Sequence, residues 1–281
     1  VGAEQAIISL EYNPASDLTK VTDPRNLATT YSPNGFGEVA SQTSPDSGTA
    51  SATFDANRNL VTKTDARGKT TTYSYDNLNR LTKLDYPTGT DTTLEYDGGA
   101  TPTPAAAGEL TKVTDESGST SFTYDSAGRL STKTQMTNGK TFTVTYTWGD
   151  TGSSLDKITA ITYPSGNRVN YVYDAYGQVS SITLSGVNGS GSGTGSTLPL
   201  LSNIGRNASG QITGWSWANG KSVTRTYDQY GQAKSYPLGE PSGSGVTRTL
   251  AYDATGAIIG FSHAASSGSL SALDQRFAYD D

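Results

Sequence analysis

The sequence has no cysteine and only one histidine, His263, among its 281 residues. These shortages exclude a disulfide framework and a zinc site of the Cys/His type. Hydrophobic residues make up 33% of the chain, which is too little for a thick aliphatic core. No apolar run reaches the roughly 18 residues of a membrane helix, and no basic stretch followed by an apolar one indicates a signal peptide. We therefore expect no membrane insertion.

Positive charge is also scarce. The chain has 20 Lys and Arg against 26 Asp and Glu, which gives a net charge of −6. A chain of this charge is poorly suited to a phosphate backbone, so we expect no nucleic-acid partner. No P-loop, dinucleotide fingerprint or G-x-S-x-G motif is present, so the sequence predicts no cofactor and no catalytic residue of these types.

What the chain does have is a repeated phrase. "YSYDNLNRL" at 73–81 returns as "FTYDSAGRL" at 122–130 and as "YVYDAYGQV" at 171–179. In each phrase the residue before the Asp or Asn, which we call the anchor, precedes an apolar residue by six positions. The anchors are Tyr12, Pro33, Phe54, Tyr75, Tyr96, Tyr124, Trp148, Tyr173, Arg206, Tyr227, Tyr252 and Tyr279. Aromatic residues hold most of these places, and only register identifies Pro33 and Arg206.

Five of the eleven spacings between successive anchors are 21 residues, as from Phe54 to Tyr75, and the other six are longer. The extra residues of the two longest repeats are Gly, Ser, Pro and Ala tracts at 98–108 and 185–196. A repeated unit of constant length, with loops whose length varies from repeat to repeat, is typical of an array of supersecondary units. We therefore expect residues 1–281 to form one repeat array with loop insertions at these two places.

The phrase also has the chemistry of a tight turn. An Asp or Asn after the anchor can accept a hydrogen bond from the backbone two residues on, and Gly three residues later tolerates positive φ. The predicted turn residues are Asp76, Asp125, Asp174, Asp228 and Asp253, with Gly128, Gly177, Gly210, Gly231 and Gly256. Asn79 is a usable substitute for Gly, whereas Arg58 predicts a strained or different turn.

A second turn lies between successive phrases, as in "TDARG" at 64–68 and "YPSG" at 163–166. Residues between the turns alternate with period two, as Tyr73 and Tyr75 do, which places both on one face of a strand. Each unit of about 21 residues then reads strand, turn, strand, turn. The sequence predicts an all-β, antiparallel array with no long helix.

The residues "YDNLNRL", "YDSAGRL", "YDAYGQV" and "YDATGAI" resemble the YD repeat of the Rhs family, over essentially the whole chain. Relatives in that family include bacterial Rhs proteins, the C component of Tc toxins, wall-associated contact-inhibition proteins and teneurins. The resemblance implies a β-sheet strip that spirals into a hollow β-shell around a C-terminal toxin domain. The partners it implies are the remaining repeats of a longer chain, that toxin domain and secretion machinery. It also implies a secreted or cell-surface bacterial location.

Two features depart from the family pattern. Shells of the family have many more repeats than the twelve anchors here, so we expect the chain to be a piece of a longer polypeptide. The self-cleavage signature of the family, of the D-P-x-G-L type, is absent, and Asp23-Pro24 occupies a second turn. The sequence thus predicts a non-catalytic wall segment rather than the processing end of such a protein.

Other functions remain as alternatives. Rows of aromatic side chains could bind glycans in an adhesive module, and Trp215 and Trp217 are the candidates for a surface contact. A glycoside hydrolase needs two facing carboxylates, but the adjacent pair Asp280 and Asp281 would point to opposite sides of a strand. The recurrent Asp residues could suggest calcium, yet each has a local turn to start. His263 is interpreted as a polar residue near a loop, and we expect no metal site.

Overall fold

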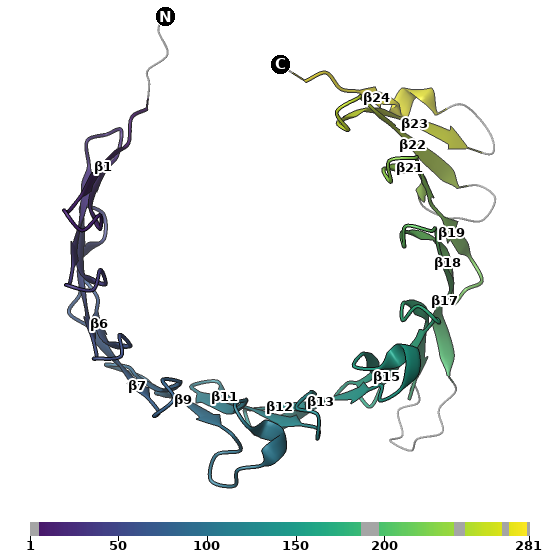
Figure 1. The fold of residues 1–281 in the computed structure, drawn as a ribbon. Coiled ribbons are helices and arrows are strands. Elements are labelled where there is room, and N and C mark those ends of the chain that lie inside the picture. The colour runs from purple at the N-terminus through teal and green to yellow at the C-terminus, as the bar shows by residue number, and fades with distance from the viewer. Residues whose placement is uncertain (1–5, 187–196, 239–244, 266–269, 280–281) are drawn as a thin grey trace, which may run out of the picture. The chain divides into compact units, whose positions relative to one another are not determined.

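The computed structural model describes residues 6–186, 197–238, 245–265 and 270–279. It divides into two compact units, Val1–Phe142 and Thr143–Asp281, and the boundary lies within one strand. Each unit is a series of hairpins that follow one another in chain order (Figure 1). The same phrase and turn chemistry continues through both units.

In the first unit each strand pairs antiparallel with the next one in sequence, from β1 to β12. Phrase turns and second turns therefore lie on opposite margins of the sheet. The strands are β1 (Ser9–Tyr12), β2 (Leu18–Thr22), β3 (Ala28–Pro33), β4 (Val39–Ser44), β5 (Gly48–Phe54), β6 (Leu60–Thr64), β7 (Thr70–Tyr75), β8 (Leu81–Asp85), β9 (Thr92–Tyr96), β10 (Leu110–Asp115), β11 (Gly118–Tyr124) and β12 (Leu130–Thr137).

The second unit repeats this arrangement from β13 to β19 and again from β20 to β24. The ladder is interrupted at Arg225, whose backbone N–H donates to the carbonyl of Thr213 at 2.7 Å. The strands are β13 (Lys140–Trp148), β14 (Ile158–Thr162), β15 (Arg168–Tyr173), β16 (Val179–Ser185), β17 (Leu198–Arg206), β18 (Ile212–Trp217), β19 (Ser222–Thr224), β20 (Thr226–Tyr227), β21 (Ala233–Leu238), β22 (Val246–Tyr252), β23 (Ile258–Ala265) and β24 (Gln275–Arg276).

The register follows the sequence repeat. Tyr75 pairs with Leu81 after a β-bulge, and Tyr124 pairs with Leu130 in the same way. The two anchors placed only by register behave alike, because Pro33 pairs with Val39 and Arg206 with Ile212. In these repeats the apolar residue six positions after the anchor is thus its cross-strand partner, whereas Tyr96 and Trp148, which have longer connections, pair with Leu110 and Ile158. The bulge re-aims the strand into the turn.

The sheets have almost no enclosed core. Among the described residues only Ala106, Gly149, Ala160 and Gly260 are buried, and no large side chain is fully buried. Strands are held instead by the backbone ladder and by cross-strand pairs such as Thr53 with Thr62 and Thr123 with Thr132, whose hydroxyl oxygens lie 2.6 Å apart in each pair. Each unit is therefore a thin wall with two accessible faces.

Helical structure within the described residues is limited to three short 3₁₀ turns, η1 (Pro104–Ala106), η2 (Gly152–Ser154) and η3 (Ser271–Leu273). No helix in this part of the chain is long and apolar enough to cross a membrane. The first predicted insertion, 98–108, contains η1, whereas residues 187–196 of the second lie outside the described residues. The predicted all-β antiparallel class is confirmed.

Candidate functional site

The margin formed by the phrase turns carries the recurrent side chains of the sequence. At Asp125, carboxylate Oδ1 accepts the backbone N–H groups of Ala127 and Arg129 at 2.9 and 3.0 Å. The backbone N–H of Asp125 donates to the carbonyl of Arg129, and that of Gly128 donates to the carbonyl of Asp125, both at 2.9 Å. The same four bonds recur at Asp76, Asp174, Asn207, Asp228 and Asp253.

Each phrase turn closes with a residue of positive φ. The five glycines have φ values of 76°, 71°, 80°, 79° and 90°, in the order Gly128, Gly177, Gly210, Gly231 and Gly256. Asn79 and Arg58 hold the same place with φ of 59° and 69°.

The turn at Arg58, predicted to be strained or different, has the ordinary hydrogen bonds but places a non-glycine residue at a φ of 69°, which is the strained form. Its backbone N–H donates to the carbonyl of Asp55 at 3.0 Å, as in the other turns. The Arg58 guanidinium donates to the carbonyl of Phe36 at 3.0 Å and forms an ion pair with Glu38. These contacts with the preceding turn offset the strain of a positive φ.

Three of the predicted turn carboxylates, those of Asp76, Asp125 and Asp253, are stabilised in their ionised form. The backbone N–H of Arg80 holds the pKa of Asp76 below its usual value, and the backbone N–H of Arg129 does the same for Asp125. The side chain of Thr255 is the main cause of the lowered pKa of Asp253. Asn207 supplies the same acceptor oxygen without a charge.

The anchor tyrosines make one bond that recurs along the margin, which we call the latch. The Tyr75 hydroxyl donates to the carbonyl of Leu60 at 3.0 Å, and the Tyr173 hydroxyl donates to that of Ile158 at 2.6 Å. The acceptor is in each case the cross-strand partner of the preceding anchor. The other latches join Tyr124 to Leu110, Tyr227 to Ile212, Tyr252 to Ala233 and Tyr279 to Ile258. Phenylalanine could fill the same space but could not donate this bond.

Neighbouring phrase turns are also joined through the side chain five residues after the anchor. Arg80 forms ion pairs with Asp76 at 2.7 Å and with Asp97 of the next turn at 2.6 Å, and its guanidinium lies 4.4 Å from the centre of the Tyr96 ring. Gln211 and Gln232 instead donate to the carbonyls of Gly231 and Gly256 in the following turns, at 2.6 and 3.4 Å. Together with the latches, these contacts join neighbouring repeats along the phrase-turn margin.

The tip of the phrase turn, which is the third residue after the anchor, shows a second regularity. Phe36, Leu78, Tyr176 and Tyr230 are 75%, 70%, 89% and 79% exposed, more than any other large hydrophobic residue in the described chain. They belong to the second, fourth, eighth and tenth anchors. The repeats between and around them have small or polar tips, which are Ala15, Asn57, Gly99, Ala127, Thr151, Ser209 and Thr255.

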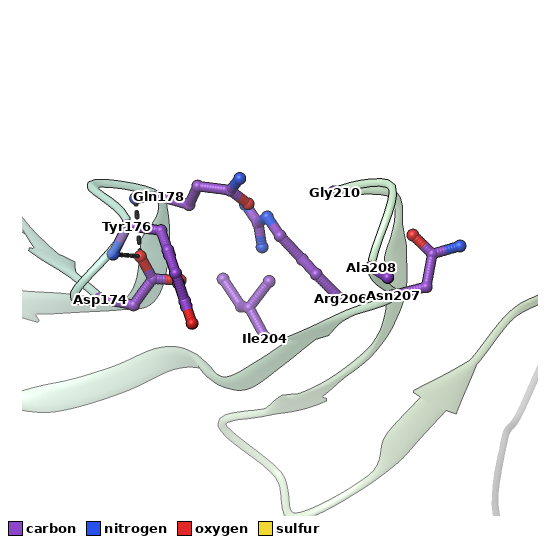
Figure 2. A pocket seen from close by; sticks show the side chains of 8 residues that line it. All are labelled: Asp174, Tyr176, Gln178, Ile204, Arg206, Asn207, Ala208 and Gly210. Carbon is purple, nitrogen blue, oxygen red and sulfur yellow. Dashed lines mark hydrogen bonds between the residues drawn. The ribbon is translucent and has the colours of Figure 1, made fainter.

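One pocket of about 510 Å³ lies between the phrase turns at Asp174 and Asn207. Figure 2 shows the Tyr176 ring along one side, Ile204 between the turns, and the Arg206 and Gln178 side chains pointing toward one another above it. Arg206 occupies an anchor place, and its side chain makes no hydrogen bond within the described residues. Its Nη1 and the Gln178 Oε1 are both buried without a partner there. Arg206 has no hydroxyl and forms no latch, as is also true of the anchors Pro33, Phe54 and Trp148.

The two tryptophans proposed for surface contact differ in exposure. Trp217 is 45% exposed, whereas Trp215 is half-buried with its Nε1 atom buried and unpartnered in the described residues. Their ring centres lie 5.9 Å apart in an edge-on arrangement, and the Arg225 guanidinium lies 4.9 Å from the Trp215 ring. Only Trp217 offers an open ring to a ligand.

The only histidine, His263, lies in β23, two residues before the strand ends at Ala265. Its side chain is 2% exposed, and Nδ1 lies 3.2 Å from a carboxylate oxygen of Asp274. The Arg248 Nε–H donates to Nε2 at 3.1 Å. Both ring nitrogens are therefore engaged, and His263 is not free to act as a general base.

The acidic residues in the described part of the chain form no cluster suited to a metal ion. Among the residues the structure describes, no group of three or more His, Cys, Asp or Glu side chains could hold a metal ion. Each turn Asp faces its own backbone. Asp280 and Asp281 lie outside the described residues.

Comparison with known proteins was informative at two levels. The RHS Repeat family model matches residues 12–49, 54–93 and 106–143, and the first two matches begin at the anchors Tyr12 and Phe54. The chain contains RHS repeats. No curated protein sequence matches it. The latches of Tyr75 and Tyr124 and the phrase turns at Asp76 and Asp125 lie within the matched residues.

Solved structures extend the likeness to nearly the whole chain. A crystal structure of TcdB2-TccC3 is similar over 94% of this chain and 15% of that one, with a TM-score of 0.73 and 17% identity. TcdB2-TccC3 without its hypervariable C-terminal region is similar over 92% of this chain and 14% of that one, with a TM-score of 0.69 and 16% identity. The Tc holotoxin pore of Photorhabdus luminescens is similar over 92% of this chain and 14% of that one, with a TM-score of 0.70 and 16% identity. The shared fold is that of the RHS β-shell, and this chain spans about one seventh of those chains.

Sequence reasoning found the anchors and turns but missed two features of the site. The latches need the distance between a hydroxyl and a carbonyl on a neighbouring strand, which no spacing reveals. The alternation of large and small tips is visible in the sequence once register is fixed, because the tip is always the third residue after the anchor.

Proposed function

We propose that this chain is a stretch of wall in an RHS β-shell that encloses a toxin or effector polypeptide carried elsewhere in a longer protein. The observation that carries the proposal is the thin antiparallel sheet whose neighbouring repeats are joined by latches along the phrase-turn margin. Such a wall separates two aqueous spaces without a core of its own. Its mechanism would be containment, with no reaction at the wall.

The likeness to TcdB2-TccC3 supports this proposal, because those proteins include a hypervariable C-terminal region by their own description. We expect a secreted or cell-surface location for the longer protein. The proposed partners are the remaining repeats, the enclosed polypeptide and the machinery that exports it.

Protease protection of the natural full-length polypeptide tests the proposal. We expect any segment that follows the repeats to resist protease while the wall is intact. A variant with Tyr124→Phe and Tyr173→Phe together should shorten that protection. Cleavage of the segment at the rate of an unfolded peptide in the unaltered protein would refute enclosure.

A glycan-binding module is the second candidate, favoured only by the exposed ring of Trp217. It predicts measurable binding in a glycan panel that falls at least tenfold in the Trp217→Ala variant and is unchanged in Trp215→Ala. Absence of binding across neutral and acidic glycans would remove this candidate.

A further inference from the structure

The exposed tips and the pocket of Figure 2 form complementary parts of one surface. We propose that the phrase-turn margin of the second unit is a self-association surface, on which an exposed tyrosine tip of one chain enters the pocket beside Arg206 in a second copy. This inference is independent of enclosure, because it needs only the margin itself.

The tips are unusual for their position. An exposed tyrosine ring at a turn tip offers an apolar body and a polar hydroxyl to a partner, and tyrosine is enriched at protein interfaces. Tyr176 and Tyr230 are 89% and 79% exposed, and the small tip Ser209 lies between them in the order of turns. Because each repeat contributes two strands spaced about 4.8 Å apart, the two tyrosines are separated by roughly 19 Å along the margin.

The pocket has the size and chemistry to receive such a tip. It holds about 510 Å³, its floor is Ile204, and one side is the Tyr176 ring (Figure 2). Ser209 belongs to the turn on the other side, whose small residues leave the entrance open. An aromatic ring would gain apolar contact with Ile204 and edge or stacking contact with Tyr176.

Arg206 supplies the specific preference for an aromatic partner. Three other arginines of this chain lie over aromatic rings, at 4.4 Å for Arg80 and Tyr96, 4.9 Å for Arg225 and Trp215, and 4.2 Å for Arg248 and Phe261. Arg206 has no such ring and no hydrogen-bond partner in the described residues. An incoming tyrosine would complete the same cation–π contact that the chain uses elsewhere.

A second copy is the occupant that matches this pattern. Two margins placed antiparallel about a two-fold axis can set Tyr230 of each chain opposite the pocket of the other. Ser209 then lies close to the axis. Each large tip of one chain faces a part of the partner margin where the tips are small. The large and small tips have the same spacing on both partners because both are the same sequence. Since few residues meet, we expect weak association, with a Kd on the order of 100 μM.

Sedimentation velocity over protein concentrations from about 5 to about 500 μM tests the association. We expect the weight-average sedimentation coefficient to rise with concentration, and the Kd to increase at least tenfold in Tyr230→Ser. Tyr163→Ser is the matched control, because Tyr163 is an exposed tyrosine on the opposite margin. Constant sedimentation at all concentrations, or an equal effect of both substitutions, would overturn the proposal.

Cysteine cross-linking gives a second test that does not depend on affinity. The chain has no cysteine, so a single substitution reports one position. We expect Ser209→Cys to form disulfide-linked dimers at least tenfold faster than Ser165→Cys, which places the same change on the second-turn margin. Equal rates for these two exposed serines would contradict the arrangement.

Arg206→Tyr separates association from folding. This substitution restores the anchor tyrosine and fills the pocket, so we expect association to weaken while the melting temperature is kept or raised. Unchanged association would show that the pocket does not receive the tip.

Discussion

Two successive repeats of the second unit differ at one anchor. At Tyr173 the hydroxyl donates to the carbonyl of Ile158 at 2.6 Å, which joins this repeat to the neighbouring strand β14. At Arg206 no latch forms, and a pocket of about 510 Å³ opens between the two turns. Both repeats keep the same turn and the same cross-strand pairing. The difference shows that the turn and the register do not need the anchor tyrosine, whereas the hydrogen bond to the carbonyl on the neighbouring strand does.

This comparison assigns separate tasks to separate residues. The Asp or Asn and the Gly build the turn locally, by bonds within five residues. The tyrosine acts between repeats, because its acceptor lies on the neighbouring strand at the start of the preceding hairpin arm. Four changes test this division, and they follow in order of expected effect.

The largest effect is expected from Gly177→Val. A valine at a φ of 71° is strained, and its Cβ would lie 2.0 Å from the Lys157 Nζ and 3.0 Å from the Ser153 carbonyl oxygen. We expect a loss of about 2–4 kcal/mol, measured by urea unfolding. Gly128→Val is the control with nothing within 4 Å of the added Cβ, and it should cost less. Equal costs would mean that the φ strain alone decides.

Tyr173→Phe removes the latch and keeps the ring. The Ile158 carbonyl loses its side-chain donor, so we expect a loss of about 1 kcal/mol. Tyr163→Phe is the control, because no bond of that hydroxyl is found in the described residues. A melting temperature that falls no further in Tyr173→Phe than in Tyr163→Phe would remove the latch from the account.

Arg206→Tyr makes the reverse change. Val179 is the cross-strand partner of Tyr173, so its carbonyl is the acceptor that a new hydroxyl would reach. We expect a gain of about 0.5–1 kcal/mol in unfolding free energy. Arg206→Phe supplies the ring alone and should gain less. A loss of stability with both variants would show that Arg206 stabilises the fold by itself.

The smallest effect concerns pH. Because the folded pKa of Asp125 is depressed, its contribution to stability is present above the usual carboxyl pKa of about 4 and is lost as pH falls through the folded value. We expect the fall in melting temperature between about pH 5 and about pH 3 to be shallower in Asp125→Asn, which copies the uncharged turn of Asn207. A steeper fall would contradict the sign of this contribution.

Much of this architecture is predictable from sequence because its determinants are local. The rule that an anchor pairs with the residue six positions later places even Pro33 and Arg206 correctly. The contacts that offset the strain at Arg58 were not predictable, since Phe36 and Glu38, which make them, lie in the preceding turn. The contacts of His263 were not predictable for a related reason, because Arg248 and Asp274, which engage it, are distant in sequence.

Enclosure is the central claim, and the intact mass of the natural polypeptide from its native source tests it most directly. The account predicts a mass several times the 29.4 kDa of this sequence, enough repeats to surround a domain and a cargo to be enclosed. A mass near 29.4 kDa would contradict it, because the polypeptide would then hold no further segment to be enclosed.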